Sequence, residues 1–309
     1  MNPFFITIDT EGDNLWANPS LIQTNNLKTL PKFQSLCEKF NYKPIYLTNW
    51  ECTNNDFFVN YFKEVQDDNK CEIGMHLHAW NNPPLNNNVK TNNPQPFLVE
   101  YDLEIMKTKI STITNILEDK FDKNLVSHRA GRWAINSHYL DYLSNLDYKI
   151  DCSYTPYINW SNLSLDYKNA RIDYSHIRNT KYNHSVDGKG MMLLPTTIIE
   201  NPDFFKIQKL LPSSIIFDKL IGKIQPKHIW LRPNGKNLKQ MLKLVDYSVT
   251  NNFEYIMFIL HSSELMEAGS PTFPNKRSIS KLYSDLESLF EYIHDKYVGE
   301  TFRDYLIKN

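Results

Sequence analysis

The chain has 309 residues, of which 41% are hydrophobic and 22% charged, so it can bury a large core. Its formal net charge of −1 argues against nucleic-acid or anionic-membrane partners recognised by bulk electrostatics. No stretch approaches the roughly 20 apolar residues of a membrane span, and the first residues lack the features of a signal peptide, which predicts a cytoplasmic protein with no transmembrane segment.

Seven short apolar runs predict strands, and most are continuous rather than alternating, as expected for strands buried on both faces of a parallel sheet. Helical patterns lie between many of them, and this alternation predicts an α/β protein with right-handed crossovers. The predicted strands are residues 4–9, 43–48, 71–75, 125–129, 148–152, 191–196 and 255–261, and the predicted helices between them are residues 27–40, 57–65, 103–117 and 139–146.

Two regions interrupt the repetition. Residues 81–96 are rich in Asn and Pro and predict a long loop, and residues 159–190 predict an insertion that acts as a lid or sets specificity. The helical patterns within residues 278–308 are expected to pack on the outside. With no internal repeat or long linker, residues 1–309 are expected to form one domain, and the four scattered cysteines are expected to be buried free thiols.

Three carboxylates follow the first predicted strand: Asp9, Glu11 and Asp13. A metal-dependent hydrolase needs an anionic ligand beside neutral imidazoles and a separate base that takes a proton from water. Two carboxylates with divided roles meet both needs. A turn built from Asp and Gly is the alternative interpretation of this segment.

His76 and His78 follow the third strand and are two residues apart, so in an extended backbone their side chains leave on the same face. Two imidazoles placed in this way can bind one metal ion. Local hydrogen bonding between the two histidines is the alternative interpretation.

Two further polar groups end strands. His261 follows a buried apolar run. A histidine in this position can donate a proton to a leaving group, because imidazole side chains generally ionise near neutral pH. Arg129 ends the fourth strand and can hold a carboxylate in place. A structural histidine and a surface ion pair are the alternatives.

The order of these blocks resembles the polysaccharide deacetylases of the NodB homology type, carbohydrate esterase family 4. The resemblance covers roughly residues 4–271 and rests on the carboxylate cluster, Glu-Ile-Gly-x-His, Arg-Ala-Gly-Arg-Trp, a later Asp and a final Leu-His. It implies a distorted (β/α)7 barrel and metal-dependent hydrolysis of N-acetyl groups on sugars.

The resemblance also implies roles for single residues. Asp9 matches the general base, and Glu11 is the nearest match to the second, metal-binding acid, although Thr10 stands where that acid usually follows and Asp13 is held in reserve. His76 matches a metal ligand. The family usually spaces its two histidines four apart, so His78 departs from the pattern.

The remaining roles fall on later strands. Arg129 resembles the arginine that orients the base, Asp151 the acid that pairs with the last histidine, and His261 the general acid. For Asp151, capping of a turn is the alternative interpretation. The bound ion is expected to be divalent, with Zn²⁺ first.

Trp80, Trp133 and Trp160 are expected to lie near the site, and the first two are our candidates for stacking on sugar rings, with packing as the alternative. The expected substrate is an acetylated amino sugar in a cytoplasmic precursor of a surface polysaccharide. Two alternatives stay open: hydrolysis of another C–N bond, as in ureides or cyclic imides, and a non-catalytic carbohydrate-binding protein.

Overall fold

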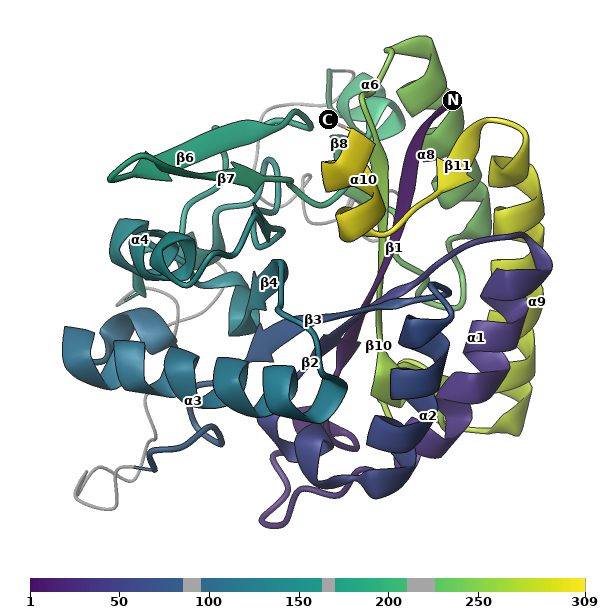
Figure 1. Cartoon of the computed structure of the whole chain (residues 1–309). Helices are drawn as coiled ribbons and strands as arrows, with labels where there is room; N and C mark the ends of the chain where they lie inside the picture. Colours follow the sequence, from purple (N-terminus) through teal and green to yellow (C-terminus); the bar gives the residue numbers. More distant parts are fainter. Residues whose placement is uncertain (86–95, 163–169, 210–225, 309) are drawn as a thin grey trace.

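The computed structural model describes residues 1–85, 96–162, 170–209 and 226–308, and it contains a curled, mainly parallel sheet (Figure 1). All seven predicted strands are present, and among the described strands of this sheet only β6 and β7 pair antiparallel. The strand order is β10 (Ile256–His261), β1 (Asn2–Thr10), β2 (Ile45–Thr48), β3 (Glu72–Leu77), β4 (Ser127–Ala130), β5 (Ile150–Asp151), β7 (Lys189–Leu193) and β6 (Tyr182–Val186). A short strand, β11 (Tyr297–Gly299), pairs with the start of β1.

Helices cover the outer face of the sheet, and in Figure 1 α1, α2 and α9 run beside one another. Farther along the sheet, α3 contacts β3, and α4 contacts β6 and β7. The four predicted crossover helices are confirmed, whereas α8 was not predicted. The helices are α1 (Leu30–Lys39), α2 (Asp56–Asp67), α3 (Leu103–Phe121), α4 (Ser137–Asn145), α6 (Pro202–Lys209), α8 (Leu238–Thr250), α9 (Lys276–His294) and α10 (Phe302–Lys308). Apolar residues such as Phe62 and Leu117 pack between helices and sheet.

The sheet forms a half-barrel. Beside β10, Ile259 N–H donates to the Leu231 carbonyl and Leu231 N–H donates to the Thr197 carbonyl, each at 3.1 Å, so single backbone hydrogen bonds connect β10 to the segment that follows β7. The neighbouring strands β8 (Ile198–Glu200) and β9 (His228–Trp230) form a separate antiparallel pair. A complete ring of seven paired strands is not found within the described ranges.

Alternate residues of the strands fill the inside of the curl. Phe5, Ile45, Ile150 and Met257 belong to one inner apolar cluster toward the amino ends of the strands. Phe302 of α10 joins this cluster, with its ring centroid 4.8 Å from that of Phe5. The expectation that α10 packs on the outside is therefore wrong, because its apolar face closes the amino-terminal end. The polar strand ends lie at the opposite, carboxyl-terminal end.

The two irregular regions fall partly outside the described residues, namely at 86–95 and 163–169. The hairpin of β6 and β7 occupies the end of the predicted insertion, and a lid role for residues 159–190 stays a prediction. The four cysteines are buried free thiols, as expected. Among the described helices, none combines the length and apolarity that crossing a membrane requires.

Candidate metal and catalytic site

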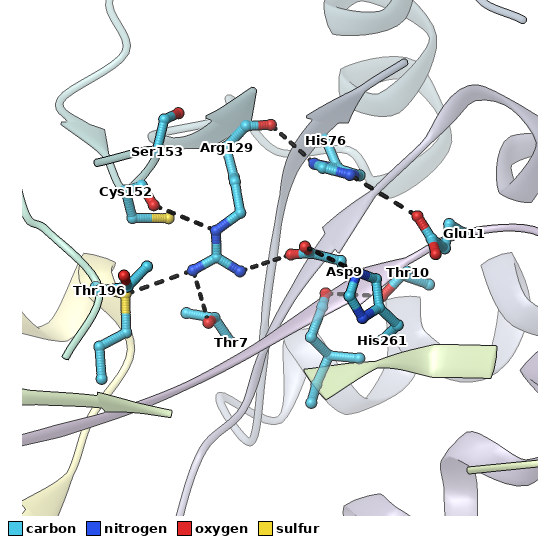
Figure 2. A network of polar contacts seen from close by, with 12 residues as sticks. Thr7, Asp9, Thr10, Glu11, His76, Arg129, Cys152, Ser153, Thr196 and His261 are labelled. Carbon is cyan, nitrogen blue, oxygen red and sulfur yellow. Dashed lines mark hydrogen bonds and ion pairs between the residues drawn. The ribbon is translucent and has the colours of Figure 1, made fainter. Parts of the chain in front are cut away.

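Strand register brings the predicted polar residues together at the carboxyl ends of the strands. Asp9 of β1 lies opposite His261 of β10, and His76 of β3 lies opposite Arg129 of β4. Residues paired in this way point to the same side of a sheet. Glu11 follows β1 directly, so its side chain joins the same group. Figure 2 shows these residues around the Asp9 carboxylate.

Glu11, His76 and His78 form a buried cluster whose ligand atoms lie within 4.8 Å of one another. The two Nε2 atoms are 3.0 Å apart, and Glu11 Oε2 lies 3.9 Å from His76 Nε2 and 3.5 Å from His78 Nε2. Tetrahedral zinc with ligands about 2.0–2.1 Å away separates its ligand atoms by about 3.3–3.4 Å. The three atoms therefore converge on a common point at the spacing that a single ion requires.

The protonation states of the two histidines suit a metal ligand. His76 Nδ1 lies 2.9 Å from the Arg129 carbonyl, which can only accept, so Nδ1 carries the proton and Nε2 keeps its lone pair. Burial lowers the pKa of His76 to about 4 and that of His78 well below its usual range. Both rings are therefore neutral near pH 7, the state that binds a cation, and the 3.0 Å contact between their Nε2 atoms is a hydrogen bond that a bound ion would replace.

The charge of the cluster also favours a cation. Burial raises the pKa of Glu11 well above its usual range, and the nearby carboxylates of Asp9, Glu51 and Glu264 raise it further. A buried carboxylate among other carboxylates is relieved by a positive ion as well as by a proton. The donor set, its spacing and its charge thus fit a divalent metal.

Asp9 is held as an ion. Arg129 Nη1 donates a 2.6 Å hydrogen bond to Asp9 Oδ1, and Nη2 donates to Thr7 Oγ1 at 2.8 Å (Figure 2). Burial opposes ionisation of Asp9, but the Arg129 guanidinium, helped by His76 and His261, outweighs it and holds the pKa of Asp9 well below its ordinary value. Since Arg129 occupies Oδ1, Oδ2 is the oxygen left to accept a proton.

His261 faces this free oxygen, with its Nε2 atom 3.8 Å from Asp9 Oδ2. The other ring nitrogen, Nδ1, lies 3.0 Å from Glu264 Oε2 and 2.9 Å from Arg232 Nη2. Glu264 Oε2 also accepts the backbone N–H of His261 at 3.0 Å. Burial disfavours the charged form of Glu264, but Arg232 and His261 prevail and lower its pKa to about 2, so Glu264 is an anion.

The expected pairing of Asp151 with His261 is corrected by these contacts. Asp151 lies opposite His128 in the strand register, and its Oδ2 atom is 2.7 Å from His128 Nδ1 and accepts Ser153 Oγ at 2.7 Å. Because His128 and Arg129 are adjacent on β4, they point to opposite faces. Arg129 points into the curl, so Asp151 lies with His128 on the face covered by helices and cannot approach His261.

Glu264 takes the place that was expected for Asp151, and this predicts a clear mutational difference. Glu264→Gln should lower kcat for the amide hydrolysis expected from the sequence by about 10- to 100-fold with KM little changed, because a charge-assisted hydrogen bond contributes about 1.5–3 kcal/mol to a protonated His261. Steady-state kinetics on metal-loaded protein measures this. Asp151→Asn is the comparison, and its main effect should be on stability. A larger loss of kcat in Asp151→Asn than in Glu264→Gln would contradict the assignment.

The two predicted sugar-stacking residues are already in contact with site residues. Trp80 stacks on His78 with ring centroids 4.2 Å apart, and Trp133 is only 8% exposed, with its ring 5.3 Å from the Arg129 guanidinium carbon. The adjacent Arg132 lies 5.3 Å from the Trp80 ring. Contact of Trp80 and Trp133 with a sugar stays a prediction.

The loops that carry the ligands are tied together by residues that sequence reasoning missed. Glu51, after β2, accepts the Gly12 N–H and the Asn81 side-chain amide, each at 2.7 Å. It therefore joins the segment that bears Glu11 to the segment that follows His78. Asp13, the reserve metal candidate, instead accepts the backbone N–H groups of Asn25 and Asn26. Glu264 is three residues after His261, so the sequence could have indicated it as a partner of this histidine. Arg232 lies in an irregular segment without hydrophobic periodicity, so no sequence pattern indicated it.

The sequence matches no protein-family model and no curated protein. The fold is nevertheless similar to that of several solved structures. One is a Mycobacterium smegmatis protein assigned as a polysaccharide deacetylase, with a TM-score of 0.54, 11% identity, and coverage of 99% of this chain and 92% of that one.

Two other similar structures are enzymes of different activity. The 4-alpha-glucanotransferase of Thermococcus litoralis has a TM-score of 0.54, 11% identity, and coverage of 100% of this chain but 40% of its own. A GH57 branching enzyme of Thermococcus kodakaraensis has a TM-score of 0.55, 9% identity, and coverage of 99% of this chain and 71% of its own. At these identities the similarity establishes the fold, and the activity has to be argued from the site.

Proposed function

We propose that this chain is a divalent-metal-dependent hydrolase that removes N-acetyl groups from an amino sugar. The observation that carries the proposal is the convergence of Glu11, His76 and His78 beside an ionised Asp9 and a histidine, His261, across from it. The similarity in fold to a protein assigned as a polysaccharide deacetylase supports it. Fold alone does not separate amide from glycoside chemistry, and the histidine pair favours metal-assisted hydrolysis of an amide.

Asp9 acts as the general base. Its Oδ2 atom takes a proton from the water that attacks the acetyl carbon, while Arg129 holds Oδ1 and fixes the direction of the carboxylate. Arg129 also makes Asp9 a weak base, so the water has to be made more acidic by another group. Glu11, His76 and His78 would hold a divalent ion, which would supply that Lewis acidity and favour negative charge on oxygen.

His261 acts as the general acid. Its Nε2 atom gives a proton to the leaving nitrogen as the C–N bond breaks, and Glu264 stabilises the protonated ring through Nδ1. The products are acetate and a free amine. Since Asp9 gains one proton and His261 loses one, the 3.8 Å between Oδ2 and Nε2 allows the pair to return to its starting state.

Metal titration combined with acetate release tests the proposal. Wild-type protein should bind about one Zn²⁺ per chain by titration calorimetry and release acetate from N-acetylhexosamines in a chelator-sensitive manner. His76→Ala should bind no Zn²⁺ at this site, because Glu11 and His78 alone leave the ion underligated. His184→Ala is the matched control, since His184 pairs with Asp141 away from the site and should leave zinc binding intact.

The alternatives give different results in the same experiment. Stoichiometric zinc with cleavage of hydantoin or another cyclic imide, but no acetate, would assign hydrolysis of a different C–N bond. Sugar binding with neither zinc nor acetate release would assign a non-catalytic carbohydrate-binding protein. An unchanged zinc stoichiometry in folded His76→Ala would show that the metal site is misplaced.

A further inference from the structure

One exposed tryptophan lies against the proposed acid, His261. Trp16 is 45% exposed, yet its ring packs edge-on against the His261 imidazole, with centroids 5.0 Å apart and an interplanar angle of 75°. Trp80 and Trp133, by contrast, are committed to His78 and to the protein interior. Trp16 therefore offers an aromatic surface at the site that is in contact with solvent.

The segment that presents Trp16 is fixed at its base. Asp13 N–H donates to the Gln23 carbonyl at 2.7 Å, and the Asp13 carboxylate accepts the backbone N–H groups of Asn25 at 3.0 Å and Asn26 at 2.8 Å. These bonds close residues 13–25 into a loop that begins directly beside Glu11. The third carboxylate after β1, that of Asp13, thus stabilises this loop.

Within this loop, Trp16 belongs to a single 3-10 turn, η1 (Leu15–Ala17), rather than to an extended segment. Asn14 and Asn18 flank the turn with left-handed φ angles of 45° and 49°, a conformation that asparagine adopts more readily than most residues. The backbone therefore reverses on both sides of Trp16 and holds its side chain toward β10.

The proposed reaction places the substrate relative to this ring. The acetyl carbon lies toward Asp9 and the metal ligands, and the leaving nitrogen lies at His261 Nε2. The group that bears the nitrogen consequently extends past His261, where Trp16 is the exposed neighbour. We propose that Trp16 is the stacking platform for the pyranose ring that carries the N-acetyl group. This inference rests on the proposed function and names its substrate as a cyclic amino sugar.

The physical basis is the shape and polarity of the two rings. A pyranose presents a face of C–H groups with hydroxyls around its edge, and the flat indole buries that apolar face while the hydroxyls stay hydrated. Trp16 also keeps water from one side of His261, which favours proton transfer to the leaving nitrogen over exchange with solvent.

Binding and kinetics on zinc-loaded protein test the proposal, with N-acetylglucosamine, N-acetylgalactosamine and N-acetylmannosamine as sugar probes and N-acetylethanolamine as an acyclic amide. Trp16→Ala should weaken calorimetric binding of the sugar that wild type binds best by about tenfold, and Trp16→Phe should retain most of the affinity. The preference in kcat/KM for this sugar over the acyclic amide should fall by about the same factor. Phe57→Ala is the matched control, because Phe57 is an aromatic side chain with 44% exposure on α2.

If Trp16→Ala lowered kcat/KM equally for the sugar and for the acyclic amide, the stacking proposal would be overturned, and Trp16 would only support His261. Unchanged sugar affinity in Trp16→Ala, or no binding of any of the three sugars by wild type, would also overturn it. Failure of the proposed function looks different: wild type would bind a sugar and lose that binding in Trp16→Ala, yet release no acetate from any probe.

Discussion

Asp9→Asn is expected to lower kcat for acetate release by about 10²- to 10⁴-fold while Zn²⁺ stays bound. The asparagine side chain keeps nearly the same shape but cannot accept the proton of the attacking water. Glu11, His76 and His78 are unchanged by the substitution, so the metal stoichiometry should remain that of wild type. Single-turnover acetate release with parallel calorimetry of Zn²⁺ binding measures both quantities.

The control for this experiment is the same chemical change at an exposed ion pair. Asp203 of α6 pairs with Lys243 at the surface, and Asp203→Asn should retain wild-type kinetics. If Asp9→Asn, shown to be folded and metal-loaded, keeps more than about a tenth of the wild-type kcat, another group takes the proton and the mechanism is wrong.

Much of the site could be predicted from the sequence because apolar runs mark strands and parallel strands end on the same edge. Asp9, His76, Arg129 and His261 each follow such a run, and all four meet at the carboxyl ends of their strands. The closed (β/α)7 barrel stays a prediction, since β10 is connected to the segment that follows β7 by single backbone hydrogen bonds through Leu231 and not by a paired strand within the described ranges.

For a short strand, the sequence did not predict which side chains point into the curl and which point toward the helices. Strand β5 contains only Ile150 and Asp151, and the run around it shows no alternation that would tell inside from outside. The resemblance therefore assigned Asp151 to His261, although Glu264 was only three residues from that histidine. Arg232 and α10 depend on contacts between segments far apart in the chain, for which hydrophobic periodicity carries no information.

The contact between Arg129 and Asp9 is expected to have the largest effect on stability. Both side chains are buried, and removing one partner of a buried ion pair leaves the other charge uncompensated. Arg129→Met, which keeps part of the aliphatic stem, should lower the free energy of unfolding by about 3–5 kcal/mol at pH 7. Urea unfolding followed by circular dichroism measures the change.

A double-mutant cycle separates the ion pair from the other contacts of Arg129. Asp9→Asn/Arg129→Met should lose less stability than the sum of the two single variants, because neither charge is then left alone. Additive losses would show that Arg129 stabilises the fold mainly through Thr7 Oγ1 and the Cys152 carbonyl, to which it also donates.

The pH dependence of the same variants has a definite sign. In wild type Arg129 holds the pKa of Asp9 below its ordinary value, so the stabilisation is present above about pH 4 and is lost only as pH falls through the lower, folded-state value. In Arg129→Met burial acts on Asp9 without that guanidinium and raises the pKa of the carboxyl, so the folded variant takes up a proton more readily than the unfolded chain. The stability difference between wild type and Arg129→Met should therefore be largest near pH 7 and narrow toward pH 4. A difference that stays constant over this range would mean that Asp9 is not the group that Arg129 stabilises.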